Sequence, residues 1–352
     1  MKPGYRPFGA FRFLLAMMVL LQHGLLVLPP AAREGFYTWE LGAIAVTVFF
    51  ALSGFIVAEA LDSFYAGRPG AFLANRALRI IPPYLAALTL ALAVDASLAR
   101  AGHLVSLDAP LTGAPLQWRL IIASVLEIVP GLPIHRISLQ DFSPIPFAWT
   151  LRVEFAFYLA AFAATLARRR ASPAIIPLAL MLAYGAFVLF AWRQTQGGGS
   201  APMQLLCIPF FGFGIALYAL HRRPGATSRL HLCGAAGATL LAFTFWHQRG
   251  HPALLYQLPL LAVLLCMLGL LARPRAIPAK IRHWDRRVGE LTYPLYISHG
   301  IVLTLITSLS PARGALPYAA AIALSLALAA ALHITVERPL TRLRDHIRGA
   351  AA

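Results

Sequence analysis

Long apolar runs, each bounded by glycine, proline or charged residues, repeat along almost the whole chain. A helix needs about 20 apolar residues to cross the hydrocarbon core of a bilayer. With 59% hydrophobic and 12% charged residues, the 352-residue chain has too little polar surface for a water-soluble globule. We therefore predict an all-α, polytopic integral membrane protein with about ten transmembrane helices in a single domain over 1–352. The predicted spans are 11–30, 41–62, 81–99, 147–167, 173–192, 202–220, 230–247, 252–272, 290–309 and 316–335.

The basic residues of the chain predict its orientation. The net charge is +17, but the lysines and arginines stand between apolar runs, and no basic arm or helix could follow a nucleic-acid backbone. With the N-terminus inside, most of them fall in cytoplasmic loops, which places both termini in the cytoplasm. The largest outer loop is then 100–146. Its apolar segment 118–134 carries Arg119, Glu127 and Pro130 and is interpreted as interfacial or re-entrant.

Two ionisable residues interrupt the first apolar run. Arg12 and His23 are almost three helical turns apart, so they share one helix face and stand roughly 16 Å apart along its axis. Ionisable side chains inside a bilayer mainly line a cavity, a proton path or a reactive site. The alternative is an arginine that snorkels to the inner interface and a histidine that bonds to a neighbouring helix.

A pair of arginines precedes the third span. Arg76 and Arg79 are three residues apart and thus neighbours on one helix face at the predicted cytoplasmic end, and Pro82 and Pro83 suit a first helical turn. Two adjacent guanidinium groups match the geometry of phosphate. The alternative is ordinary cytoplasmic positive charge.

Further polar groups occur in spans 4 and 9. Glu154 lies about two turns into span 4, near the depth of His23, where it could orient a histidine or hold an acceptor hydroxyl; a structural salt bridge is the alternative. Trp149 suits the interfacial belt, and Arg152 points to a different face from Glu154. Tyr296 and His299 are three apart on span 9, where they either line the same cavity or belong to the core.

Two short motifs complete the set. Ser53 and Gly54 in FFALSGFIV permit close approach of helices in the middle of span 2. Glu337 in VERP closes span 10 beside Arg338, where it could pair with the inner arginines.

In this order, the motifs resemble those of the acyltransferase-3 family of integral membrane acyltransferases. The matching residues are Arg12 and His23, FFALSGF at 49–55, Arg76 and Arg79, Trp149 and Glu154, Tyr293 to His299, and Glu337 to Pro339. Each motif is short, but together they cover the whole chain in register. The chain would be a stand-alone member without a fused C-terminal hydrolase-like domain. Arg152 stands where the family more often has a small polar residue, which indicates a specialised acceptor side.

The resemblance implies a ten-span O-acyltransferase. The Ala- and Arg-rich composition suggests a bacterial source, and we therefore expect it in a bacterial inner membrane. Such an enzyme moves an acyl group, commonly acetyl, from cytoplasmic acyl-coenzyme A to a hydroxyl of a glycan or glycolipid at the outer face. His23 would be catalytic, as a general base or through an acyl-histidine, with Glu154 beside it. Arg12, Arg76 and Arg79 would bind the donor, while Trp149, Tyr296 and His299 would contact substrate.

The polar residues also permit other functions. A transporter or flippase of a lipid-linked sugar could use the same path, although no inverted repeat is present, and a silent member could act as a scaffold. Three cysteines without paired spacing predict neither a disulfide framework nor a metal site. Apart from acyl-coenzyme A as co-substrate, we expect no tightly bound cofactor.

Overall fold

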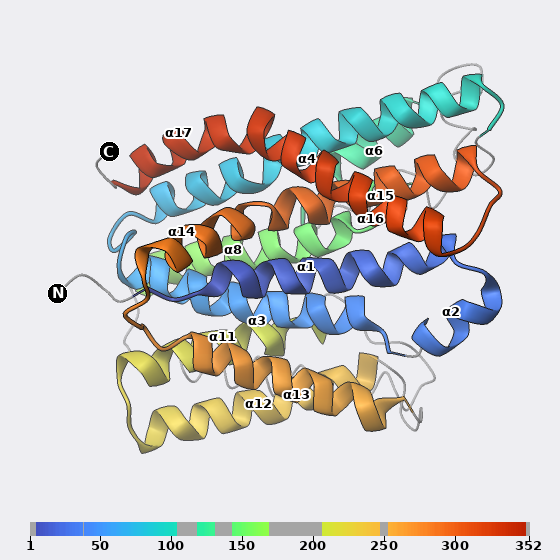
Figure 1. The fold of residues 1–352 in the computed structure, drawn as a ribbon. Helices are drawn as coiled ribbons and strands as arrows, with labels where there is room; N and C mark the ends of the chain where they lie inside the picture. Colours follow the sequence, from blue (N-terminus) through green and yellow to red (C-terminus); the bar gives the residue numbers. More distant parts are fainter. Residues whose placement is uncertain are drawn as a thin grey trace. The chain divides into compact units, whose positions relative to one another are not determined.

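The computed structural model describes residues 5–37, 39–103, 118–130, 143–168, 206–246 and 253–349. Within these ranges the regular elements are helical, apart from an isolated bridge between Tyr5 and Arg275 (Figure 1). The helices are α1 (Phe8–Gly24), the 3-10 turn η1 (Leu25–Val27), α2 (Pro30–Tyr37), α3 (Leu41–Asp62), α4 (Pro69–Arg100), α6 (Trp118–Leu126), α8 (Ala148–Arg168), α11 (Ile208–Arg222), α12 (Ala226–Trp246), α13 (Leu254–Leu271), α14 (Ala279–Glu290), α15 (Thr292–Leu309), α16 (Ala315–Leu332), the π turn η2 (His333–Glu337) and α17 (Arg338–Arg348).

The helices follow the predicted spans. Every predicted span contains a helix except 173–192, which lies outside the described residues. Among the described residues, 5 helices are long and apolar enough to cross a membrane: Phe8–Val27, Leu41–Asp62, Pro69–Arg100, Leu254–Leu271 and Ala315–Arg348. The all-helical membrane class is therefore supported, whereas the number of ten spans and the side of the termini stay predictions.

Helix α4 begins earlier than we predicted. The prediction placed Pro82 and Pro83 in a first turn, but the helix starts at Pro69 and runs through both prolines. Proline lacks an amide hydrogen and would leave carbonyls of the preceding turn unbonded, a defect that transmembrane helices tolerate when neighbouring groups compensate. Beside the two prolines, the Tyr293 hydroxyl donates to the Ile80 carbonyl at 3.0 Å. The arginine pair of this motif therefore lies inside a continuous helix.

The chain forms two compact units, one of residues 1–46, 75–156 and 274–352, and the other of 47–74 and 157–273. In the second unit, α3 and α11 meet through glycine. A Cβ atom at Gly54 would collide with the Phe211 carbonyl, and one at Gly214 with the Ala51 carbonyl. The close helix approach predicted for the FFALSGFIV motif is thus confirmed.

The first unit has α1 at its centre. Helix α1 packs against α14, α15 and α16, and α15 packs along α16 (Figure 1). Helix α6 has nine residues and rises about 14 Å, roughly half the thickness of a hydrocarbon core. That length fits the prediction that segment 118–134 does not cross the membrane.

A carboxylate from a distant helix caps α1. Asp285 of α14 accepts hydrogen bonds from the backbone amides of Gly9 at 3.0 Å and Ala10 at 2.7 Å, and from the Tyr5 hydroxyl at 2.7 Å. The first amides of a helix lack partners within it, and negative charge is favourable at that end. Burial, followed by the bond to Asp285, raises the pKa of Tyr5 to about 12. Asp285 thus fixes the start of the helix that carries Arg12 and His23.

We expect Asp285→Ala to lower the free energy of unfolding by about 1–3 kcal/mol, because buried amides lose a charged acceptor. Thermal unfolding of the purified variant in detergent measures the effect. Asp345→Ala is the matched control, since Asp345 is exposed on α17. Equal melting temperatures for the two variants would contradict the capping role.

Candidate active site

His23 and His299 form a hydrogen-bonded pair between α1 and α15. His23 Nδ1 lies 2.9 Å from His299 Nε2, and the rings are nearly parallel with centroids 5.2 Å apart. His299 is 1% exposed. Its Nδ1 atom lies 3.1 Å from the Leu295 carbonyl of the preceding turn. The sequence left open whether His299 lines the same cavity as His23 or belongs to the core; the structure brings the two imidazole rings into direct contact.

Phe147, immediately before α8, stacks on both imidazole rings. Its centroid lies 4.5 Å from that of His23 and 4.3 Å from that of His299, with interplanar angles of 17° and 20°. Stacked aromatic faces limit the rotation of the rings in the pair. Sequence analysis did not single out Phe147, because a phenylalanine in an apolar run carries no distinguishing signal.

Tyr296 extends the polar site toward α8. Its hydroxyl lies 2.8 Å from the Thr150 hydroxyl, and both side chains are buried. The charge of Glu154 acts on Tyr296. Trp149 is half-buried on the same helix. The sequence suggested that Glu154 could orient a histidine. In the structure, the group hydrogen-bonded to Nδ1 of His23 is His299.

Arg152 ties α8 to the segment that follows α6. Its Nε atom donates to the Glu127 carbonyl at 2.5 Å, and a guanidinium nitrogen lies 4.0 Å from the Glu127 carboxylate. Ser143 Oγ donates to the same carboxylate at 2.8 Å, and Tyr84 of α4 donates to the Ser124 carbonyl at 2.6 Å. Arg152 thus links α8 to Glu127, the residue that follows α6.

A second constellation surrounds Arg12 near the start of α1. The charges of Arg79, Asp285 and Glu337 all act on the Arg12 guanidinium. Arg12 Nε is buried, and no hydrogen-bond partner for it exists among the described residues. Arg76 lies one turn before Arg79 on α4. The structure thus brings Arg12 and Arg79, which the sequence placed in separate motifs, into one electrostatic cluster.

The π turn after α16 positions the carboxylate of this cluster. Glu337 interacts electrostatically with Arg79 and Arg344. His333 bridges two carboxylates, at 3.4 Å from Glu337 and 3.6 Å from Glu290. A π turn adds a residue to the helical repeat, and such turns are frequent at functional sites. Glu337 is thus within electrostatic reach of two arginines, and it pairs with His333.

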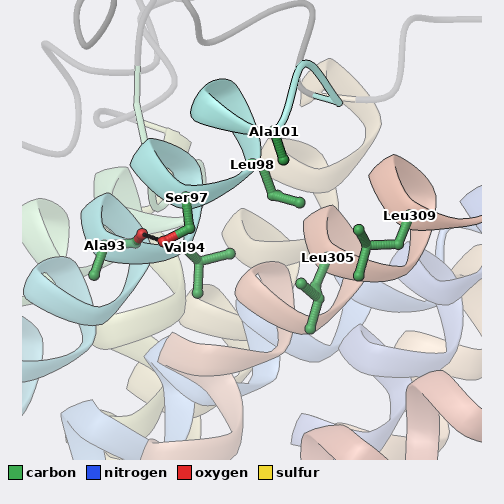
Figure 2. Close-up of a pocket in the computed structure, with 7 residues that line it drawn as sticks. All are labelled: Ala93, Val94, Ser97, Leu98, Ala101, Leu305 and Leu309. Carbon is green, nitrogen blue, oxygen red and sulfur yellow. Dashed lines mark hydrogen bonds between the residues drawn. The ribbon is translucent and has the colours of Figure 1, made fainter.

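A separate hollow of about 360 Å³ lies between α4 and α15 in the first unit (Figure 2). Its lining is mainly aliphatic, including Val94, Leu98, Leu305 and Leu309. The hydroxyl of Ser97, the polar side chain in its wall, donates to the Ala93 carbonyl at 2.7 Å. Among the described residues, those that line this hollow carry no titratable side chain.

The fold and the site together define a class. Among the described residues, five helices are apolar and long enough to span a membrane, a histidine pair joins α1 to α15, and Arg12 interacts electrostatically with Arg79 near the other end of α1. The acyltransferase-3 family model, described as an acyltransferase domain, matches residues 8–334. The chain belongs to this family of membrane acyltransferases. Searches of curated proteins and of solved structures give no match.

Proposed function

We propose that the protein is an O-acyltransferase that moves an acyl group, in the first instance acetyl, from cytoplasmic acyl-coenzyme A to a hydroxyl of a glycan or glycolipid at the outer face. One observation carries the proposal. Helix α1 bears Arg12, whose buried Nε atom lacks a hydrogen-bond partner among the described residues, and about 16 Å further along it bears His23, which is held in a defined hydrogen bond. The first suits the phosphates of the donor and the second suits proton transfer.

The donor would bind at the end of α1 that carries Arg12. With both termini on the cytoplasmic side of a bacterial inner membrane, the Arg12 end of α1 faces the cytoplasm, which supplies acyl-coenzyme A. Arg12, Arg76 and Arg79 would contact its phosphates, because guanidinium groups bind phosphate oxygens in pairs. The extended pantetheine arm would then carry the thioester toward His23.

The chemistry requires one base and one displacement. Neutral His23 accepts the proton of the acceptor hydroxyl while the hydroxyl oxygen attacks the thioester carbonyl. The new C–O bond forms, the C–S bond breaks, and the proton passes from His23 to the departing thiolate, which leaves as coenzyme A. Tyr296 would help to stabilise the thioester oxygen as it gains charge, with His299 acting through its hydrogen bond to His23. Glu154 and Trp149 would hold the acceptor.

Incubation of the purified protein in detergent with labelled acetyl-coenzyme A tests the proposal. We expect release of free coenzyme A, together with transfer of label to a hydroxyl acceptor extracted from the native membrane. Movement of a lipid-linked sugar across proteoliposomes without acyl transfer would overturn the proposal in favour of a transporter. Mass spectrometry of surface glycans and lipids from a deletion strain identifies the acceptor by its missing acyl group.

The donor site has its own prediction. We expect Arg12→Gln to raise KM for acetyl-coenzyme A about 10- to 100-fold at nearly constant kcat, because a hydrogen bond to a charged group contributes about 1.5–3 kcal/mol. With acetyl-pantetheine, which has no phosphate, wild type and variant should have equal KM. Arg342→Gln removes an exposed arginine of α17 and controls for net charge. An equal rise in KM with both donors would rule out a phosphate contact.

A further inference from the structure

We infer that His299 is a positioning residue that fixes the tautomer of His23, so that Nε2 of His23 is the basic atom. The inference rests on the proposed function and adds to it the identity of the reacting nitrogen. It changes the role of His299 from the substrate contact that the sequence predicted.

The Leu295 carbonyl determines the proton of His299. A carbonyl oxygen only accepts hydrogen bonds, so Nδ1 of His299, at 3.1 Å, must carry a hydrogen. A neutral imidazole has one N–H, which leaves Nε2 of His299 as an acceptor. With its ring 1% exposed in an apolar bundle, His299 is most stable in this neutral form.

His299 in turn determines the proton of His23. Because Nε2 of His299 accepts, Nδ1 of His23, at 2.9 Å, must donate. The single hydrogen of neutral His23 is therefore on Nδ1, and its Nε2 carries a lone pair. In the opposite tautomer, two lone pairs would face each other across 2.9 Å. The Leu295 carbonyl thus determines, through the rings of His299 and His23, that Nε2 is the basic atom of His23.

The arrangement also serves the charged intermediate. When Nε2 of His23 takes the acceptor proton, the ring becomes an imidazolium, and its Nδ1–H bond to neutral His299 becomes charge-assisted and stronger. Phe147 stacks on both rings and restricts their reorientation. The same geometry assigns Nε2 as the nucleophile in an acyl-histidine mechanism, since Nδ1 is occupied in either case.

Substitutions at position 299 test the inference. His299→Phe keeps an aromatic ring against Phe147 but removes the acceptor, and we expect kcat to fall about 10²- to 10⁴-fold, as for a base held in the wrong tautomer. KM for acetyl-coenzyme A should change less than about twofold, because Arg12, Arg76 and Arg79, which would bind the donor, are unchanged. His299→Gln offers an amide oxygen near the position of Nε2, so its kcat should be at least about tenfold higher than that of His299→Phe.

A matched control exists in the second unit. His221 of α11 makes the same bond to its own preceding turn, with Nδ1 2.8 Å from the Leu217 carbonyl, but belongs to neither constellation of the first unit. His221→Phe should therefore keep wild-type kcat. Melting temperatures of all three variants separate lost turnover from lost folding.

Nitrogen NMR of ¹⁵N-histidine-labelled protein reads the tautomer directly. We expect His23, assigned by its absence in His23→Ala, to carry hydrogen on Nδ1 in the wild type and to lose this preference in His299→Phe. Wild-type kcat in His299→Phe, equal losses in the Phe and Gln variants, or hydrogen on Nε2 of His23 would each overturn the inference. If His23→Ala is inactive while His299→Phe is fully active, only the tautomer inference fails. Full activity of His23→Ala would contradict the proposed base itself.

Discussion

Replacement of His23 by alanine is expected to lower kcat for acetyl transfer about 10²- to 10⁴-fold, the range that general acid–base catalysis contributes. The hydroxyl of a sugar is a poor nucleophile until a base removes its proton. In the described part of the first unit, the hydrogen bonds of His23 and His299 leave Nε2 of His23 with a lone pair that can accept this proton. Single-turnover kinetics with labelled acetyl-coenzyme A measure the chemical step separately from product release.

The control for this substitution is His231→Ala, which removes an exposed histidine of α12. Donor binding should persist in His23→Ala, since Arg12 and Arg79 lie near the other end of α1. Retention of more than about a tenth of wild-type kcat, in a folded protein that binds donor normally, would contradict a role for His23 as general base. A stable acyl adduct found in the wild type and missing in the variant would favour the acyl-histidine alternative.

The helices were predictable because their signal is local. Runs of about 20 apolar residues have few other solutions in a chain with 12% charged residues, and the structure places helices in them. The positions of Arg12 and His23 on one helix face follow from the helical repeat alone. The boundaries were less predictable. Pro82 and Pro83 lie inside α4, a position that proline disfavours in soluble helices and that transmembrane helices tolerate.

The partners of the site residues were not predictable from spacing. His23 and His299 are separated by 276 residues, and so are Gly9 and Asp285. No periodicity or local propensity connects positions so far apart; only the packing of α1 against α14 and α15 does. The sequence identified the ionisable side chains because each is costly in an apolar run. It could not say that one histidine would orient the other.

Gly9→Ala is expected to destabilise the protein by about 3 kcal/mol, near the upper end of the usual cost of overpacking. A Cβ atom at Gly9 would collide with the backbone carbonyl of Asp285, and one at Gly289 would come within 2.6 Å of the Gly9 Cα atom. The backbones of α1 and α14 are thus in contact, and a backbone carbonyl cannot rotate away as a side chain can. Separation of the helices would also break the Asp285 cap and displace Arg12, so loss of donor binding should accompany loss of stability.

The same substitution at Gly237 of α12 provides the control. Among the described residues, and apart from the adjacent backbone of α12 itself, no atom lies within 4 Å of a Cβ built at Gly237, so Gly237→Ala gains helix propensity of up to about 1 kcal/mol without a clash. The two variants differ by one methyl group each, yet their melting temperatures in detergent should move in opposite directions. If Gly9→Ala instead raised the melting temperature, the α1–α14 backbone contact would not exist in the protein. A lowered melting temperature with unchanged KM for acetyl-coenzyme A would show that this contact supports the fold without positioning Arg12.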